Sequence, residues 1–223
     1  MVRKPLIVAT SNPGKLREFR ALLSDLPFEL HGLGELGIVP PEETGASFLE
    51  NALLKARHAA AAAAAALHGS PAAGVAAIAD DSGLEVDALG GAPGIFSARY
   101  AGAGADDAAN NAKLLRALAG IPPALRRARY RCALVFVCGA GDSAPLVAEG
   151  DWEGIILESP RGSGGFGYDP YFWLPELGMT AAQLEPPDKN RRSHRGIAMR
   201  SLLAQLAARE RPAECGAPRA VLR

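Results

Sequence analysis

The segment PLIVATSNPGKLREF, near the start of the chain, joins an apolar strand pattern directly to a helix pattern over residues 15–24. A strand that feeds straight into a helix is the building unit of α/β proteins, so this junction constrains the fold class. Asn12 can cap the helix, Pro13 suits its first turn, and Gly14 allows a close approach to the backbone. With Lys15 beside them, the free N–H groups of the helix start could hold an anion, although a plain strand-to-helix turn has the same pattern.

The predicted elements alternate in the first half of the chain and change to consecutive strands in the second half. They are strands at 5–10, 75–79, directly after Asp81, 128–138, 145–149 and 152–158, and helices at 15–24, 47–67, from Asp106 onward and from Ser193 to about residue 209. Consecutive strands imply antiparallel pairing, so we expect an α/β fold with a mixed sheet. Residues 1–209 should form a single domain, and residues 210–223, with two prolines and no periodicity, a loosely ordered C-terminal tail.

Composition excludes several classes of partner. Lys plus Arg and Asp plus Glu number 24 each among 223 residues, so the chain has no global basic field. Nucleic acids and anionic membrane surfaces are bound through such a field, and we expect neither as a partner. The N-terminal MVRKPLIVAT has no long apolar signal segment, and no stretch approaches the length of a membrane span, so we expect a cytoplasmic protein.

Two pairs of adjacent acidic residues are candidate metal ligands. Asp80 and Asp81 follow a predicted strand, so we expect them at its C-terminal edge, where α/β sheets place ligands. Adjacent residues of an extended backbone point to opposite faces, so the two aspartates should have different roles. Glu42 and Glu43 lie in a loop, and with Asp81 they would supply the oxygen ligands that Mg²⁺ prefers. An aspartate pair that caps a turn explains Asp80 and Asp81 equally well.

The glycine-rich segment GSGGFGYDP contains a GxGGxG pattern that is typical of dinucleotide-binding loops. A proline and an aromatic strand follow it where that motif requires a helix, so we reject this interpretation. Glycines here would let a planar ligand pass close to the backbone, with Phe166 or Tyr168 available for stacking. A plain hairpin turn is the alternative.

The segment DKNRRSHRG crowds cations around the predicted start of the last helix, with Ser193 as its cap. Cations are disfavoured at a helix N-terminus because the helix dipole is positive there, so the crowding favours a bound anion over a solvated basic turn. The cationic and imidazole side chains involved are Lys189, Arg191, Arg192, His194 and Arg195. Together with Lys15, the carboxylates and the aromatic glycine loop, this set suits a nucleoside triphosphate.

Five segments, in this order, resemble the inosine/xanthosine triphosphate pyrophosphatases: TSNPGKLRE, ETGASFLENALLKA, ADDSGLEVDALGGAPGIFSARYAG, GFGYDPYF and KNRRSHRGIA. Members of that family hydrolyse ITP, dITP and XTP to the monophosphate and pyrophosphate, which keeps deaminated purines out of DNA and RNA. The resemblance implies a two-lobed α/β fold around a long mixed sheet, and a homodimer. The departures are the alanine-rich insertion near 59–73 and the tail after about residue 209.

The resemblance also implies roles for individual residues. Asp81 would be the proton acceptor, Lys15 would be catalytic through its contact with phosphate, and Glu43 and Asp81 would hold Mg²⁺. The other positions that would bind substrate are Thr10, Ser11, Asn12, Pro13, Gly14, Ser82, Phe166, Gly167, Tyr168, Asp169, Lys189, His194 and Arg195.

Other functions remain as alternatives. The chain could be a pyrophosphatase for other nucleotides such as dTTP or UTP, like the septum-formation inhibitor proteins, or a nucleotide-binding regulator without turnover. A purine deaminase is disfavoured because the HxE and PCxxC pair is missing. The sequence leaves open the preference among ITP, dITP and XTP, the means of rejecting GTP, and whether Asp80 shares the metal.

Overall fold

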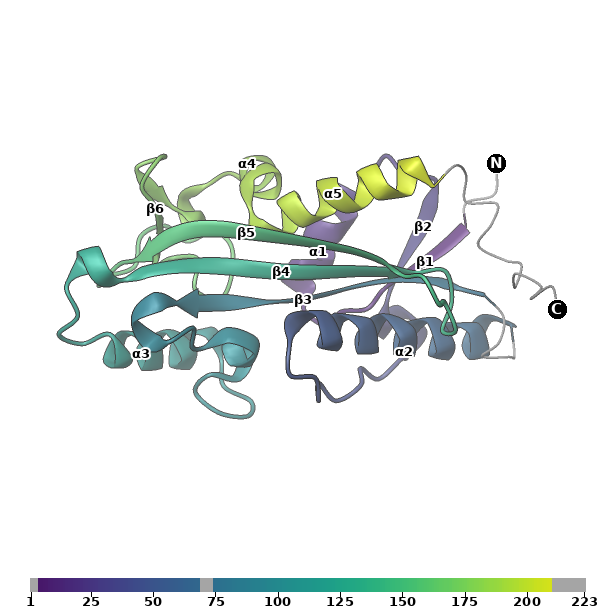
Figure 1. Cartoon of the computed structure of the whole chain (residues 1–223), viewed down its shortest axis with the longest axis horizontal. Helices are drawn as coiled ribbons and strands as arrows, with labels where there is room; N and C mark the ends of the chain where they lie inside the picture. Colours follow the sequence, from purple (N-terminus) through teal and green to yellow (C-terminus); the bar gives the residue numbers. More distant parts are fainter. Residues whose placement is uncertain (1–3, 69–73, 210–223) are drawn as a thin grey trace.

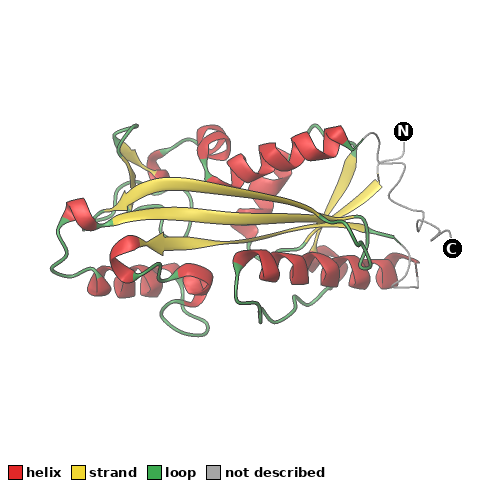
Figure 2. Ribbon diagram, in the orientation of Figure 1, coloured by secondary structure: helices red, strands yellow, loops and turns green. Residues whose placement is uncertain are grey.

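A computed structural model describes residues 4–68 and 74–209, in which seven strands form one sheet in the order β2-β1-β3-β4-β5-β6-β7 (Figures 1 and 2). The strands are β1 (Lys4–Val8), β2 (Phe28–Gly32), β3 (Ala76–Val86), β4 (Arg127–Val137), β5 (Leu146–Ile156), β6 (Phe172–Leu174) and β7 (Met179–Thr180). The α-helices are α1 (Pro13–Leu22), α2 (Phe48–His68), α3 (Asp107–Ala117), α4 (Pro186–Arg192) and α5 (His194–Ala208). The short 3₁₀ helices are η1 (Leu33–Leu36), η2 (Asp87–Leu89), η3 (Gly94–Arg99), η4 (Pro123–Leu125) and η5 (Ala181–Gln183).

Parallel pairing is confined to one edge of the sheet. β1 runs parallel to both of its neighbours, and its pairing with β3 ends where Val8 lies opposite Ile78. From β3 to β7 each neighbouring pair is antiparallel. The predicted α/β fold with a mixed sheet is therefore confirmed. β3 continues well beyond the end of β1, so the edge of β3 that β1 leaves open faces the loop before α1.

Alanine side chains bring α2 close to one face of the sheet. Those that are buried are Ala52, Ala56, Ala59, Ala60, Ala63 and Ala64. They pack in one cluster with Ala77 and Ala79 of β3 and with Ala133 and Val135 of β4. Small side chains on both sides of a close-packed interface shorten the distance between helix and sheet. A longer polar side chain of α2 that faces the sheet can therefore reach the side chains of β3.

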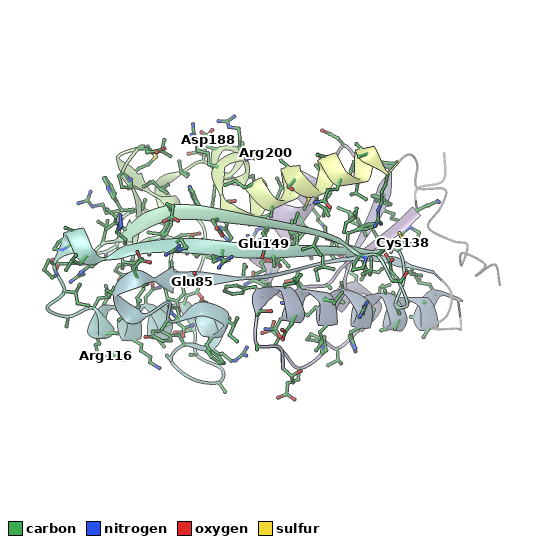
Figure 3. All side chains as sticks on the ribbon, viewed as in Figure 1. Glu85, Arg116, Cys138, Glu149, Asp188 and Arg200 are labelled. Carbon is green, nitrogen blue, oxygen red and sulfur yellow. The ribbon has the colours of Figure 1, made fainter. Side chains whose placement is uncertain are left out.

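Two further clusters complete the core. α1 and α5 cover the opposite face of the sheet through Phe19, Met199 and Leu202. At the other end of the long strands, Leu114 of α3 and Leu118, directly after this helix, join a cluster with aromatic residues of β4, β5 and β6. Figure 1 shows α2 and α3 near opposite ends of these strands. The long strands also carry charged side chains, such as Glu85 of β3 and Glu149 of β5, which Figure 3 labels.

Two predicted interruptions of strands are wrong. β3 runs through Asp80 and Asp81, so the aspartates do not end a strand, and β5 spans the turn predicted between 145–149 and 152–158. β4 pairs with both strands along most of its length, and this continuous ladder outweighs the local preference for a turn. Helix α4 was not predicted. The predicted tail, 210–223, lies outside the described residues.

Gly150 of β5 sets how closely α5 approaches the sheet. A Cβ atom there would lie 2.2 Å from the His194 carbonyl oxygen and 2.7 Å from the Ala198 nitrogen, both backbone atoms. We expect Gly150→Ala to lower the free energy of unfolding by about 1–3 kcal/mol, because α5 must shift away from the strand. Gly141→Ala is the matched control, since a Cβ at Gly141 meets nothing within 4 Å. Urea denaturation compares the two variants, and equal unfolding free energies would contradict this account.

Candidate active site

The loop between β1 and α1 has the capped geometry that its sequence predicts. The Asn12 side chain accepts a hydrogen bond from the Lys15 backbone nitrogen at 3.0 Å, and Pro13 occupies the first turn of α1. The Thr10 hydroxyl accepts from the Asn12 nitrogen at 3.2 Å. A Cβ at Gly14 would lie 2.8 Å from Cδ1 of Phe166, so Gly14 admits the Phe166 ring against the start of the helix. The close approach predicted at Gly14 is thus made by a side chain of the same chain.

Asp80 points to the face of the sheet that α1 and α5 cover. It is 1% exposed, and its Oδ2 atom lies 3.0 Å from Lys15 Nζ and 3.0 Å from Arg195 Nη2. Glu18 of α1 pairs with Arg195 and lies 3.1 Å from Lys189 Nζ. Although burial opposes ionisation, the cations of Lys15 and Arg195 hold the pKa of Asp80 far below its usual range. Asp80 is therefore an anion that ties two helices to the sheet.

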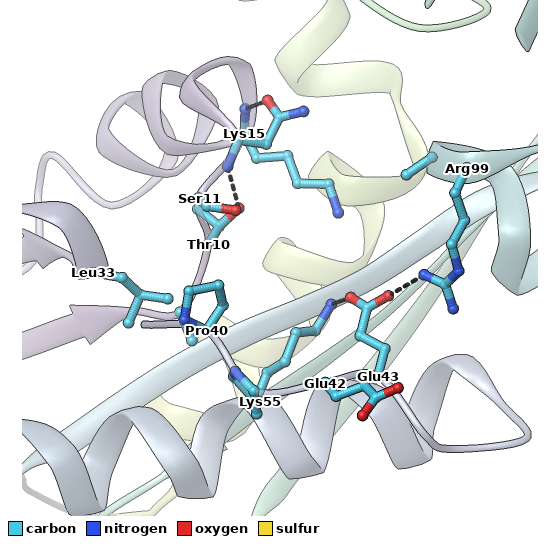
Figure 4. Close-up of a pocket in the computed structure, with 13 residues that line it drawn as sticks. Thr10, Ser11, Lys15, Leu33, Pro40, Glu42, Glu43, Lys55 and Arg99 are labelled. Atoms are coloured by element: carbon cyan, nitrogen blue, oxygen red, sulfur yellow. Dashed lines mark hydrogen bonds and ion pairs between the residues drawn. The ribbon is translucent and has the colours of Figure 1, made fainter. Parts of the chain in front are cut away.

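Asp81 points to the opposite face, toward α2. Lys55 Nζ lies 2.8 Å from Asp81 Oδ1 and 2.9 Å from Glu43 Oε1, and Asn51 donates to Asp81 Oδ2 at 3.2 Å. Arg99 Nη1 binds the other oxygen of Glu43 at 2.9 Å, and Figure 4 shows Lys55 and Arg99 on two sides of that carboxylate. Burial raises the pKa of Asp81, and the nearby Lys55 cation offsets only part of this effect. The prediction that the two aspartates face different partners is confirmed.

The carboxylates of Glu43 and Asp81 are placed so that they could bind a magnesium ion together. One oxygen of each carboxylate lies within 2.9 Å of the same point, the Lys55 ammonium, so the pair already converges on a cation. Within residues 4–68 and 74–209 no group of three or more His, Cys, Asp or Glu side chains could hold a metal. Mg²⁺ is commonly bound by one or two carboxylates with water and substrate phosphates. The donor set therefore suits a metal that arrives with a phosphorylated ligand.

The glycine loop is held in place by Asp169. This carboxylate accepts hydrogen bonds from Lys189 Nζ at 2.6 Å, the Phe166 backbone nitrogen at 2.9 Å and the Tyr130 hydroxyl at 3.1 Å. Gly165 has a φ of 72°, and a Cβ there would lie 2.1 Å from Asp169 Oδ2. Only glycine fits between the loop backbone and the carboxylate. The loop is a built structure that fixes the Phe166 ring, with Lys189 Nζ 4.5 Å from the ring centroid.

His194, the first residue of α5, lies in an aromatic stack. Its ring is parallel to the Tyr130 ring, with centroids 4.7 Å apart and an interplanar angle of 12°. The residue is 6% exposed, and among the described residues its Nδ1 atom has no hydrogen-bond partner. Buried polar atoms without a partner are uncommon in folded proteins. Burial, with the cations of Arg195 and Lys189, lowers the pKa of His194 well below its ordinary value, so the ring is neutral.

Two neighbouring cavities bring the predicted residues together. The larger, about 490 Å³, is lined by Thr10, Ser11, Lys15, Glu43, Lys55 and Arg99, among others (Figure 4). The smaller, about 100 Å³, is lined by Ser82, Phe166, Tyr168, Lys189, His194 and Arg195, among others. Asn12, Lys15 and Ala98 line both. A ligand with a polyanionic end and a planar end could therefore extend from one cavity into the other.

Most of the predicted site residues line these cavities, and several partners were missed. Gly167 and Asp169 also line the smaller cavity, whereas Pro13, Gly14 and Asp81 line neither. The missed residues are Glu18, Asn51, Lys55, Arg99 and Tyr130. Asn51 and Lys55 did leave a signal in the sequence: they are polar residues four apart on a predicted helix, and so they share one face.

Comparison with known proteins gives consistent matches. The family model described as "Ham1 family" matches residues 6–205. The dITP/XTP pyrophosphatase of Methylococcus capsulatus is 55% identical over 207 residues, covering 93% of this chain and 98% of that protein. The enzyme of the same name from Pectobacterium atrosepticum is 52% identical over 201 residues, covering 90% and 97%. The solved structure of a HAM1 protein from Coxiella burnetii matches with a TM-score of 0.80 at 42% identity, covering 92% of this chain and 99% of that one.

Among residues 4–68 and 74–209, no helix is both long enough and apolar enough to cross a bilayer.

The neutral state of His194 predicts a pH effect on stability. The unfolded chain takes up a proton at this residue below about pH 6.5, while the folded protein does not, so acid favours unfolding. We expect the free energy of unfolding to fall from pH 7 to pH 5, with His194 contributing up to about 1.4 kcal/mol per pH unit. His194→Asn should make this dependence shallower. Urea denaturation across the pH range measures both slopes, and identical slopes would show that His194 does not titrate on unfolding.

Proposed function

The chain belongs to the Ham1 family, and from this membership we propose that it hydrolyses non-standard purine nucleoside triphosphates to the monophosphate and pyrophosphate. The substrates are ITP, dITP and XTP, and their removal keeps deaminated purines out of the nucleotide pool. The observation that carries this conclusion is the pair of neighbouring cavities, one lined by cations and carboxylates and the other by aromatic rings and His194.

The triphosphate binds in the larger cavity. The loop before α1 offers the backbone N–H groups of Ser11 and Gly14, since those of Thr10, Asn12 and Lys15 already donate within the chain. Lys15 Nζ lies at this end of the cavity in its contact with Asp80. Anions bind at helix N-termini because those N–H groups lack partners and the helix dipole is positive there. Lys15 therefore orients the phosphates for in-line attack.

Glu43 and Asp81 hold the metal, and Asp81 also acts on the attacking water. When bound, Mg²⁺ neutralises charge on the phosphate oxygens. The oxygen of a water molecule attacks the α-phosphorus, and pyrophosphate leaves. The Asp81 carboxylate accepts the proton that this water loses.

Recognition of the base rests on the smaller cavity. Phe166 offers a ring for stacking, which does not depend on the identity of the base. The 6-oxo group of the substrates accepts a hydrogen bond where the amino group of adenine donates one. Arg195 already makes hydrogen bonds to Asp80, Glu18 and Ser82 through four of its N–H groups. His194, which makes no ion pair within the described residues, is therefore better placed than Arg195 to contact the base from this cavity.

The enzyme acts in the cytoplasm as a homodimer. Support for the dimer comes from the family resemblance and from apolar side chains at the surface. Those that are large and exposed among the described residues are Val39, Leu49, Leu67, Phe96 and Leu125. Light scattering after gel filtration tests this assembly, with an expected mass of twice the 23.2 kDa chain.

A substrate panel tests the proposed function directly. We expect pyrophosphate release from ITP, dITP and XTP at rates far above that with ATP, because a site built around a hydrogen bond to the 6-oxo group discriminates by about 10⁴ or more against a 6-amino group. GTP, dTTP and UTP complete the panel. Activity should disappear with excess chelator and return with Mg²⁺. A preference for dTTP or UTP would favour the alternative pyrophosphatase class. Binding of ITP without turnover would identify a regulator.

Asp81→Asn tests the proposed catalytic role. We expect kcat to fall by about 10²–10⁴, because an amide does not accept the proton of the water. The control is Asp25→Asn, an exposed position in the turn after α1, and this variant should keep normal activity. Urea denaturation confirms that both variants are folded. Near-normal kcat in folded Asp81→Asn would remove Asp81 from the mechanism.

A further inference from the structure

Lys55 is a buried cation for which the mechanism above has no use. Its side chain is 10% exposed and reaches from α2 toward β3. Along the same helix the residues that face the sheet are, apart from Asn51, mostly small and apolar. A buried lysine in such surroundings is stable only when anions compensate for its lost hydration. Lys55 therefore depends on Asp81 and Glu43, and they depend on it.

Contacts from α2 engage both oxygens of the carboxylate that should act as base and ligand. Lys55 Nζ lies 2.8 Å from Asp81 Oδ1, and the amide of Asn51 lies 3.2 Å from Asp81 Oδ2. Asn51 also accepts a hydrogen bond from the Gly45 nitrogen at 2.8 Å, which ties the Glu43 loop to the same helix. Both Asp81 oxygens are thus engaged by adjacent turns of α2.

The local charges are balanced without a metal. Glu43 and Asp81 carry two negative charges, and Lys55 and Arg99 carry two positive charges at distances of 2.8–2.9 Å. A divalent cation bound between the two carboxylates would lie close to the ammonium group. Like charges a few ångströms apart in a partly buried site repel strongly. The ammonium and the metal therefore exclude each other.

We propose, on the basis of the proposed function, that Lys55 is an internal counter-ion that takes the place of the metal before nucleotide binds and moves away when the metal enters with the triphosphate. Lys55 and Lys15 both line the larger cavity, from α2 and α1 respectively, so the phosphates offer the displaced ammonium new anionic partners (Figure 4). The protein without nucleotide then binds divalent metal weakly.

Binding of Mn²⁺ without nucleotide tests the proposal. Electron paramagnetic resonance of free Mn²⁺ gives the affinity of the full-length protein. We expect weak binding by the parent, and binding at least about tenfold tighter in Lys55→Met, which removes the charge and keeps the length of the side chain. Lys55→Gln should give the same gain if the methionine variant does not fold. Lys55→Arg, which keeps the charge, should bind as weakly as the parent.

Two controls assign any gain to this site. Lys113→Met removes an exposed cation of α3 whose contacts are with the ring and backbone carbonyl of Tyr100 and not with a carboxylate, and it should leave Mn²⁺ binding unchanged. Adding Asp81→Asn to Lys55→Met should abolish the gain. Unchanged or weaker Mn²⁺ binding in the folded Lys55→Met or Lys55→Gln protein would overturn the proposal. The assay contains no nucleotide, so failure of the proposed substrate specificity would not alter its outcome.

Discussion

Two adjacent carboxylates buried in the middle of a strand impose the main constraint on this structure. Asp80 and Asp81 are 1% and 6% exposed, and an extended backbone sends them to opposite faces of the sheet. A buried carboxylate without a partner costs several kcal/mol, so each face must supply its own counter-charge. α1 and α5 supply Lys15 and Arg195 on one face, and α2 supplies Lys55 on the other. The helices that cover the sheet are therefore also the walls of the site.

The low-complexity part of α2 contributes to the site indirectly. Its alanines pack against alanine and valine side chains of β3 and β4, which holds the helix close to the sheet. From that distance Asn51 and Lys55, at the N-terminal part of the helix, reach Asp81. Larger residues at Ala59 or Ala63 would move the helix outward, and the contacts at its first turns would lengthen. The alanine-rich segment thus has a structural role that its composition alone does not reveal.

Local patterns predicted most of the longer strands and helices, the caps at Asn12 and Ser193 and the mixed sheet, because these depend on residues close in sequence, but they missed β2 and α4. They failed at Asp80 and Asp81, where charged residues resemble a strand end. What keeps β3 continuous there is the ladder with β4 and the cations from distant helices, neither of which is local. The Lys55–Glu43 and Arg99–Glu43 pairs were missed for the same reason. Family resemblance located the residues of the cleft but not their partners within it.

The ion pairs of the cleft also determine how a nucleotide binds. Asp80, Glu18 and Asp169 face Lys15, Lys189 and Arg195, and Glu43 and Asp81 face Lys55 and Arg99, so each cluster is neutral before a ligand enters. A triphosphate competes with these carboxylates for cations that are already paired. Its binding free energy is then the difference between two sets of ion pairs, which is smaller than the attraction to unpaired cations would be. A monophosphate product carries less charge and competes less well, so the same internal carboxylates favour its release.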